Sequence, residues 1–198
     1  MAALDSAGQL QTTGAARLMV AVEPTLVQRL VDGQAEAMHE LYRAHHAAVR
    51  RMVRLQVGPG GVVEDLVQDT FVRAIEQVHR YRADAPLGVW LRGIALNLAR
   101  TERSRARRRR GLLRDHAPAL PTATDPEAQT DSRRALQSLL VLMERLPSAE
   151  REAFALRSVE KVPLQEAAEI VGCPVSTLSD RDRRAQAKLR AWIAEEGR

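Results

Sequence analysis

Residues 63–78 read VEDLVQDTFVRAIEQV, and this stretch decides the fold class. Eight of its residues recur at alternating intervals of three and one, which places them on one continuous stripe of an α-helix. The stripe comprises Val63, Leu66, Val67, Thr70, Phe71, Ala74, Ile75 and Val78. The polar residues lie off the stripe, and the acidic pair at its beginning suits the positive end of a helix dipole. The pattern predicts an amphipathic helix packed against other helices.

The composition of the whole chain favours the same class of fold. Only 3% of the 198 residues are aromatic, and Ala and Leu supply most of the apolar side chains. This mixture favours helix over a β-sandwich or barrel, which need aromatic and β-branched strands. A chain of this length forms one domain or two small ones. We therefore predict an all-α protein.

Breaks in the pattern divide the chain. A helical pattern begins near Pro24, and Gly58-Pro59-Gly60-Gly61 interrupts it before the stretch quoted above. A further helix is predicted from Leu87 to about Arg105, with Trp90 on its apolar side. Three prolines then fall in a polar segment. We expect a flexible tail (1–22), two small helical domains (23–110 and 132–198) and a flexible linker (111–131).

Several classes of site are disfavoured by the residue types present. The single cysteine, Cys173, argues against a disulfide framework or a Cys-rich zinc site. Apolar runs fall far short of the ~20 residues that span a bilayer, and no secretory signal is visible. Carboxylates are scattered over predicted helix surfaces rather than paired beside a nucleophile. We expect a cytoplasmic protein with no metal, cofactor, small-molecule substrate, catalytic residue or direct membrane insertion.

Residues 163–186 have the pattern of a helix-turn-helix. A short helix with small alanines ends at Gly172, and the next helix opens with small polar residues followed by arginines. This arrangement lets a helix enter the major groove of DNA by its N-terminal end. An ordinary pair of antiparallel helices in a bundle is the alternative. Asp180 and Asp182 count against DNA contact, although Asp182 also suits a salt bridge or an acceptor for a cytosine amino group.

A dense basic run follows the predicted Leu87–Arg105 helix. Residues 100–110 contain seven arginines, offset only by Glu102. Such a run favours contact with nucleic acid, and the alternative is a solvated patch that aids solubility. If about six of these arginines met phosphates, the logarithm of affinity would fall with the logarithm of salt at a slope of about −5.

The order of these segments resembles the extracytoplasmic-function (ECF) group of bacterial sigma-70 factors. The sequence segments that resemble this family are EDLVQDTF at 64–71, APLGVWL at 85–91, IALNLA at 94–99, LPS at 146–148 and EAAEIVG at 166–172. The resemblance covers about residues 25–110 and 132–195. It implies a sigma-two-like helical bundle and a sigma-four-like helix-turn-helix domain.

The resemblance also implies roles for particular residues. Binding to core RNA polymerase would use Asp65, Leu66, Gln68 and Asp69. The minus-ten element would be bound by Tyr81, Arg82, Arg92, Asn97, Arg100 and Arg103. The minus-thirty-five element would be bound by Ser176, Thr177, Ser179, Arg181 and Arg184. Trp90 is expected to be core, and His45 with His46 a surface pair.

The function predicted from this resemblance is an ECF-type sigma factor. It would direct core RNA polymerase to promoter DNA, associate with the nucleoid when bound to polymerase, and be held in check by an anti-sigma factor. The alternative is a free-standing helix-turn-helix repressor or activator, which binds duplex DNA as a symmetric dimer. A recombinase or nuclease would need a nucleophile or metal-binding carboxylates, and no convincing set is present.

Overall fold

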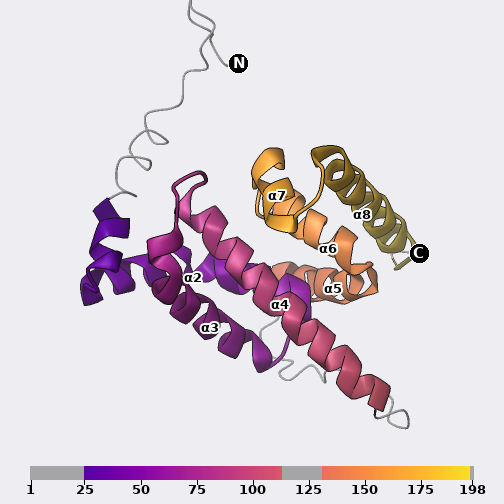
Figure 1. The fold of residues 1–198 in the computed structure, drawn as a ribbon. Helices are drawn as coiled ribbons and strands as arrows, with labels where there is room; N and C mark the ends of the chain where they lie inside the picture. Colours follow the sequence, from indigo (N-terminus) through magenta and orange to yellow (C-terminus); the bar gives the residue numbers. More distant parts are fainter. Residues whose placement is uncertain (1–24, 113–130, 197–198) are drawn as a thin grey trace, which may run out of the picture.

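The structure is a computed structural model that describes residues 25–112 and 131–196. Within these two ranges every regular element is helical, which confirms the all-α prediction (Figure 1). After a short helical segment at 25–31, the elements are α2 (Ala35–Val57), α3 (Val62–Gln77), η1 (Val78–Arg80), α4 (Leu87–Leu112), α5 (Asp131–Arg145), α6 (Ser148–Phe154), η2 (Ala155–Val159), α7 (Leu164–Val171) and α8 (Val175–Glu196). The predicted tail and most of the predicted linker lie outside the described residues.

The N-terminal half is built on α2, α3 and α4, which all contact one another. The predicted stripe of α3 faces this interior: Val67 is 1% and Phe71 6% exposed. Thr70 is fully buried and donates its hydroxyl hydrogen to the carbonyl oxygen of Leu66, which satisfies the one polar group on the stripe. The periodicity of this segment is therefore explained by burial.

Two helix boundaries differ from those predicted. The helix expected to run continuously from Pro24 breaks at Asp32–Gln34, where Gly33 adopts a φ of +73°. Glycine reaches this left-handed conformation at little cost, so the chain turns there before α2 begins. The helix expected to end near Arg105 continues to Leu112. Arginine is a good helix former, and the arginine run therefore extends α4 instead of following it.

The C-terminal half packs α5, α6 and α7 against the long helix α8. Leu178 and Ala185 of α8 are fully buried, and so are Ala153 and Leu156 from α6 and η2. Ser148 is the first residue of α6, and Pro147 occupies the cap position without a side-chain hydrogen bond. Among the helices that the structure describes, none is long and apolar enough to cross a bilayer.

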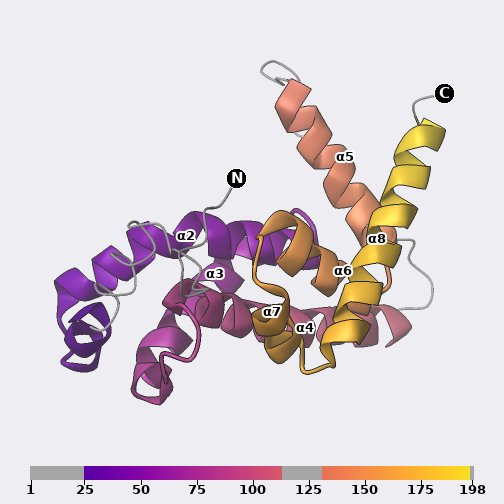
Figure 2. The same ribbon diagram turned by 90° about the horizontal axis from the view of Figure 1, so that it is seen from above.

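The two halves lie directly against each other. Helix α2 contacts α5, α6 and η2, and α4 contacts α7, which Figures 1 and 2 show beside α4. The two helices come close at Gly93 of α4, where an added Cβ would lie at an ordinary contact distance of 3.8 Å from side-chain atoms of Ile170 on α7. A single buried apolar cluster runs through both halves. The surfaces considered below are positioned by this shared core.

Candidate polymerase and DNA interfaces

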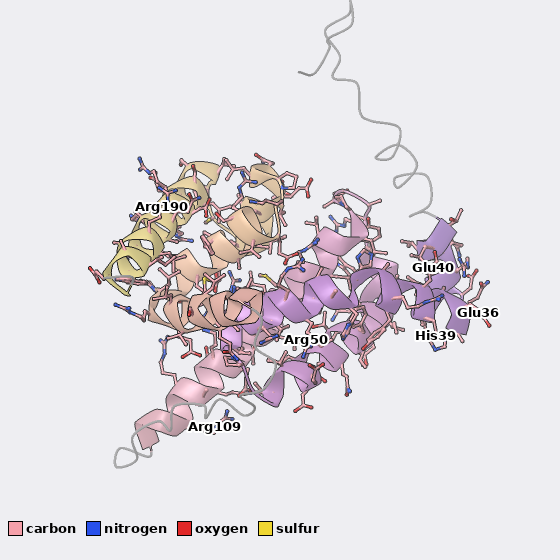
Figure 3. The ribbon with its side chains drawn as sticks, turned by 180° about the vertical axis from the view of Figure 1, so that it is seen from behind. Glu36, His39, Glu40, Arg50, Arg109 and Arg190 are labelled. Carbon is pink, nitrogen blue, oxygen red and sulfur yellow. The ribbon has the colours of Figure 1, made fainter. Side chains whose placement is uncertain are left out.

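The polar face of α3 is open to solvent. Asp65, Gln68 and Asp69 are all exposed, and among the described residues no hydrogen bond or ion pair involves their side chains. Their neighbour Glu64 accepts a hydrogen bond at 2.6 Å from Arg50, which Figure 3 labels on α2, and this bond ties the beginning of α3 to α2. Leu66, predicted with them as a polymerase contact, is only 6% exposed. Its side chain belongs to the core, because it lies on the same apolar stripe as Val67 and Thr70.

The segment between η1 and α4 forms a small cavity with an aromatic wall. The hydroxyl of Tyr81 donates a hydrogen bond to the carbonyl oxygen of Ala85 at 2.6 Å, which closes the segment on itself. The rings of Tyr81 and Trp90 lie 5.5 Å apart at 55°. Trp90 is half-buried and packs against the core, and Arg82 is exposed. Both line a cavity of about 210 Å³ whose opposite wall comes from α7.

Three predicted minus-ten arginines of α4 are engaged by the C-terminal half. Arg92 donates to the carboxylate of Glu160 at 2.9 Å. Arg100 donates to both oxygens of Glu152, at 3.0 and 2.7 Å. Arg103 Nη1 lies 3.9 Å from the same carboxylate. The predicted residues are thus brought to one face of α4, but their guanidinium groups are paired within the chain.

Asn97 and the remaining arginines of α4 lie outside these pairs. Asn97 is exposed, and its side-chain oxygen accepts a hydrogen bond from Arg100 at 3.3 Å. Arg105, Arg107 and Arg108 are exposed, and Arg109 pairs with Glu102 near the end of the helix, where Figure 3 labels it. The far end of α4 therefore carries most of the exposed positive charge of this helix.

The environment of the arginines changes their proton affinity in opposite directions. The hydrogen bond to Glu152 raises the pKa of Arg100 above its ordinary value. Desolvation lowers the pKa of Arg103, with repulsion from Arg107 and Arg100 adding to it. Burial lowers the pKa of Arg151 to about 10, with Arg103 as a further cause. All three remain charged at neutral pH, and the carboxylate of Glu152 offsets part of this positive charge between the halves.

The helix-turn-helix predicted at 163–186 is present. Helix α7 ends at Gly172, which has a φ of +75° and donates its N–H to the carbonyl oxygen of Ala168 at 2.9 Å. Ala167 and Ala168 are buried where α7 meets α8. At the beginning of α8 the exposed or half-exposed residues include Ser176, Thr177, Ser179 and Arg181. These four side chains form the accessible tip of the second helix.

Further along α8 the polar residues serve the fold. Arg184, predicted to bind DNA, lies 3.7 Å from the carboxylate of Glu150 on α6. Asp182 accepts hydrogen bonds from Ser158 at 2.8 Å and from Gln186 at 3.0 Å, so it joins α8 to η2. Asp180 is exposed and pairs with Arg183 at 2.8 Å. The aspartates that seemed unsuited to a DNA-binding helix are therefore accounted for by local pairing.

His45 is half-buried rather than a surface residue. A Cβ on Gly88 would lie 3.0 Å from its ring, and desolvation together with the charge of Arg92 lowers its pKa. His46 packs against Tyr42 instead, with ring centroids 4.7 Å apart. The predicted surface pair is thus wrong, because successive helical residues face different neighbours.

Sequence reasoning missed the residues that join the halves. Glu152 and Glu160 pair with the α4 arginines, and Arg151 donates to the backbone of α2 through the carbonyl oxygen of Gln56 at 2.9 Å. These side chains carry no periodic signal of their own. Their partners lie 52 to 95 residues away, so local pattern could not have found them.

Comparison with known proteins matches the same two helical segments. Residues 41–109 match Sigma-70 region 2, and residues 136–189 match Sigma-70 region 4. The RNA polymerase sigma factor NccH of Alcaligenes xylosoxydans xylosoxydans is 29% identical over 176 residues, covering 87% of this chain and 95% of that protein. The ECF RNA polymerase sigma-E factor of Escherichia coli K12 is 30% identical over 174 residues, covering 83% and 90%.

Solved structures agree with this assignment. CnrH, in complex with the cytosolic domain of CnrY, superposes with a TM-score of 0.65 at 26% identity, over 86% of this chain and 96% of that one. The sigma factor RpoE of Bartonella quintana, in complex with the anti-sigma factor NepR, gives a TM-score of 0.63 at 23% identity, over 79% and 96%, and supports the fold. Two sigma-70 regions in this order define the class of protein as a sigma factor. The chain belongs to the ECF group of the sigma-70 family.

Proposed function

We propose that this sigma factor binds core RNA polymerase through the polar face of α3 and leads it to promoter DNA. The observation that carries the proposal is the open carboxylate face: Asp65 and Asp69, one helical turn apart, are exposed beside Gln68. Charged groups without an internal partner keep their full capacity to pair with basic side chains of another protein. Leu66 supports this face from within the core.

The second part of the proposal assigns the DNA contacts. The segment around Tyr81 and Arg82, with Asn97 and the arginines of α4, would bind the minus-ten element. Its cavity of about 210 Å³ has an aromatic wall, which suits stacking of an unpaired base. The tip of α8 would enter the major groove at the minus-thirty-five element through Ser176, Thr177, Ser179 and Arg181. Within this scheme, 23–110 and 132–198 act as domains joined by the linker 111–131.

The third part concerns regulation. The solved structures of CnrH and of the Bartonella sigma factor RpoE contain CnrY and the anti-sigma factor NepR, respectively. We infer that an anti-sigma factor likewise restrains this chain until a signal releases it. When released, the chain would act in the cytoplasm, bound with polymerase to the nucleoid, and it would carry out no covalent step itself.

Run-off transcription with purified core enzyme tests the proposal. Templates carry the DNA upstream of the operon that encodes this chain, and a product that requires the sigma factor is expected. Absence of such a product on every template would refute the assignment.

A matched pair of variants tests the α3 face. The variant D65N/D69N should lose both core binding in a pull-down and run-off product, because it removes two charges from the open face. The control E36Q/E195Q makes the same change of net charge at two exposed positions away from α3, and it should retain both activities. Equal binding by the two variants would exclude α3 as the polymerase-binding face.

A further inference from the structure

A basic cavity lies where the beginning of α6 meets the end of α2 and the second half of α4. Its volume is about 570 Å³, which falls within the range of sites for small ligands. Its wall is shared by both halves of the chain, since the end of α5 and the first turn of α6 face α2, α4 and the beginning of α3 across it. It shares no residue with the aromatic cavity at Tyr81 and Trp90.

Positive charge dominates the wall of this basic cavity. Four arginines line it, namely Arg103, Arg107, Arg109 and Arg151. Two carboxylates, Glu102 and Glu144, line it as well, so the wall carries an excess of two positive charges. Like charges held together in a partly buried wall are unfavourable unless an anion compensates them.

The two carboxylates of the wall are engaged elsewhere. Glu102 accepts a hydrogen bond at 2.6 Å from Arg109, which Figure 3 labels on α4. Glu144 lies against Gly58, where even an added Cβ would collide with its carboxylate. Within the described part of the chain, neither carboxylate forms an ion pair with the other three arginines of the cavity. These arginines therefore keep their charge available.

Two hydrogen-bond donors at this wall have no partner. Gln56 is fully buried, and its side-chain nitrogen Nε2 forms no hydrogen bond among the described residues. The same is true of Nε of Arg151, a residue that is only 7% exposed. Buried polar groups are nearly always hydrogen-bonded, because an unpaired one loses its hydration without compensation. Both atoms are donors, so the group that would satisfy them is an acceptor.

Arg103 and Arg107 also have donors to spare. Arg103 Nη1 lies 3.5 Å from Oε1 of Gln56 and 3.9 Å from the carboxylate of Glu152, and both distances exceed that of a well-formed hydrogen bond. Arg107 is exposed and makes no hydrogen bond or ion pair with the described residues. Desolvation lowers the pKa of Arg103, and repulsion from Arg107 adds to it. An anion held between the two guanidinium groups would remove this repulsion.

The chemistry of the wall selects an anion that carries more than one phosphate group. A guanidinium group binds phosphate through two parallel N–H donors, and two phosphates match the excess charge of the wall. The cavity is much larger than one phosphate ion, and the rest of its wall is largely apolar, with Val57, Val62, Ala106, Leu146 and Pro147. None of the lining residues that the structure describes is aromatic, so an organic part would be held by apolar contact and the phosphates would supply most of the affinity.

We propose that this cavity binds a small diphosphate, and that its size and apolar wall favour a nucleoside diphosphate as the occupant. The phosphates would lie between Arg103, Arg107 and Arg151, and the nucleoside would lie against the apolar side chains. The site depends on Gln56 and Arg151, which belong to none of the surfaces proposed above for polymerase and promoter DNA. The inference therefore goes beyond the proposed function and stands without it.

Isothermal titration calorimetry of the full-length protein with ADP at constant ionic strength tests the site. Wild type should bind one ADP per chain at concentrations below about 1 mM, the upper end of ordinary ligand levels. R107Q should weaken binding about tenfold, because it removes an unpaired guanidinium group from the wall. The control R105Q makes the same change of charge at an exposed residue of α4 that does not line the cavity, and it should bind ADP as wild type does. Absence of binding by wild type, or equal loss in R107Q and R105Q, would overturn the proposal.

Thermal unfolding compares the possible sources of the diphosphate group. A ligand present at about a hundredfold excess over its dissociation constant should raise the Tm by about 5 °C. A larger rise with ADP than with pyrophosphate supports a nucleotide site, and equal rises support a site that recognises the diphosphate alone. Stabilisation by a single-stranded oligonucleotide at equal phosphate concentration, with none by ADP or pyrophosphate, would assign these arginines to nucleic acid and overturn the proposal. The same unfolding curves without ligand show whether R107Q is folded.

Discussion

Arg151 offers the sharpest test of how the two halves are held together. Its side chain is 7% exposed and donates to three backbone carbonyl oxygens: Gln56 at 2.9 Å, Glu144 at 2.7 Å and Leu146 at 3.1 Å. It therefore connects the end of α2 to the end of α5. Replacing it with methionine keeps much of the apolar stem and removes every donor.

The expected cost follows from these contacts. A hydrogen bond from a charged donor contributes about 1.5–3 kcal/mol, and R151M removes three of them. Burial of the guanidinium, which lowers the pKa of Arg151 to about 10, already offsets part of that gain in the wild-type protein. We expect R151M to reduce the free energy of unfolding by about 3 kcal/mol, because the three carbonyl oxygens lose their donor in a largely buried site.

Urea-induced unfolding followed by circular dichroism measures this loss. The control is R190M on α8, where Figure 3 labels Arg190; this exposed residue donates one hydrogen bond to Gln186 at 2.8 Å. An exposed pair of this kind contributes little, so R190M should change the free energy of unfolding by less than about 0.5 kcal/mol. A loss below about 1 kcal/mol in R151M would show that water replaces the arginine and that it does not hold the halves together.

Three further outcomes are expected from the same structure. L156A should reduce the free energy of unfolding by about 2–5 kcal/mol, since Leu156 is fully buried in the shared core, and urea unfolding that shows less than about 1 kcal/mol would contradict its burial. D182A should reduce the free energy of unfolding by about 1–2 kcal/mol, because the donors Ser158 and Gln186 lose their acceptor. D180A removes one member of an exposed ion pair and should reduce it by less than about 0.5 kcal/mol. Equal thermal stability of the two variants would show that Asp182 does not hold α8 against η2. The pKa of His45 is lower in the folded chain than in the unfolded chain, so protonation favours unfolding. The free energy of unfolding should therefore fall as the pH drops below about 6.5, and H45N should weaken this pH dependence. Unfolding of both proteins at pH 7 and at pH 5 measures the difference.

The local sequence pattern was sufficient to predict a helix wherever that helix buries one face. The α3 stripe and the α7–turn–α8 segment were both predicted, because apolar spacing and a glycine turn report short-range geometry. The same stripe already contained Leu66, so its burial could have been inferred before the structure was known. The prediction that Leu66 contacts polymerase relied on the family resemblance, although the apolar periodicity already indicated that this residue is buried.

Helix boundaries were predicted less well. The break at Gly33 follows from its left-handed backbone conformation, and α4 continues because the arginines that follow Leu98 are good helix formers. Arginine and glycine each have more than one favourable context, so their presence does not decide between a helix and its end. The structure decided both cases.

The sequence by itself determined the helical class, the division into two halves and the family, because each depends on side chains close together along the chain. Tertiary structure alone decided which polar groups are free. Arg92 and Arg100 look equally available for DNA in the sequence, yet they meet Glu160 and Glu152 at separations of 68 and 52 residues. Ion pairs between residues so far apart in the sequence form only when the helices pack, because packing brings the two charged groups together and removes the water that solvates each of them in the unfolded chain.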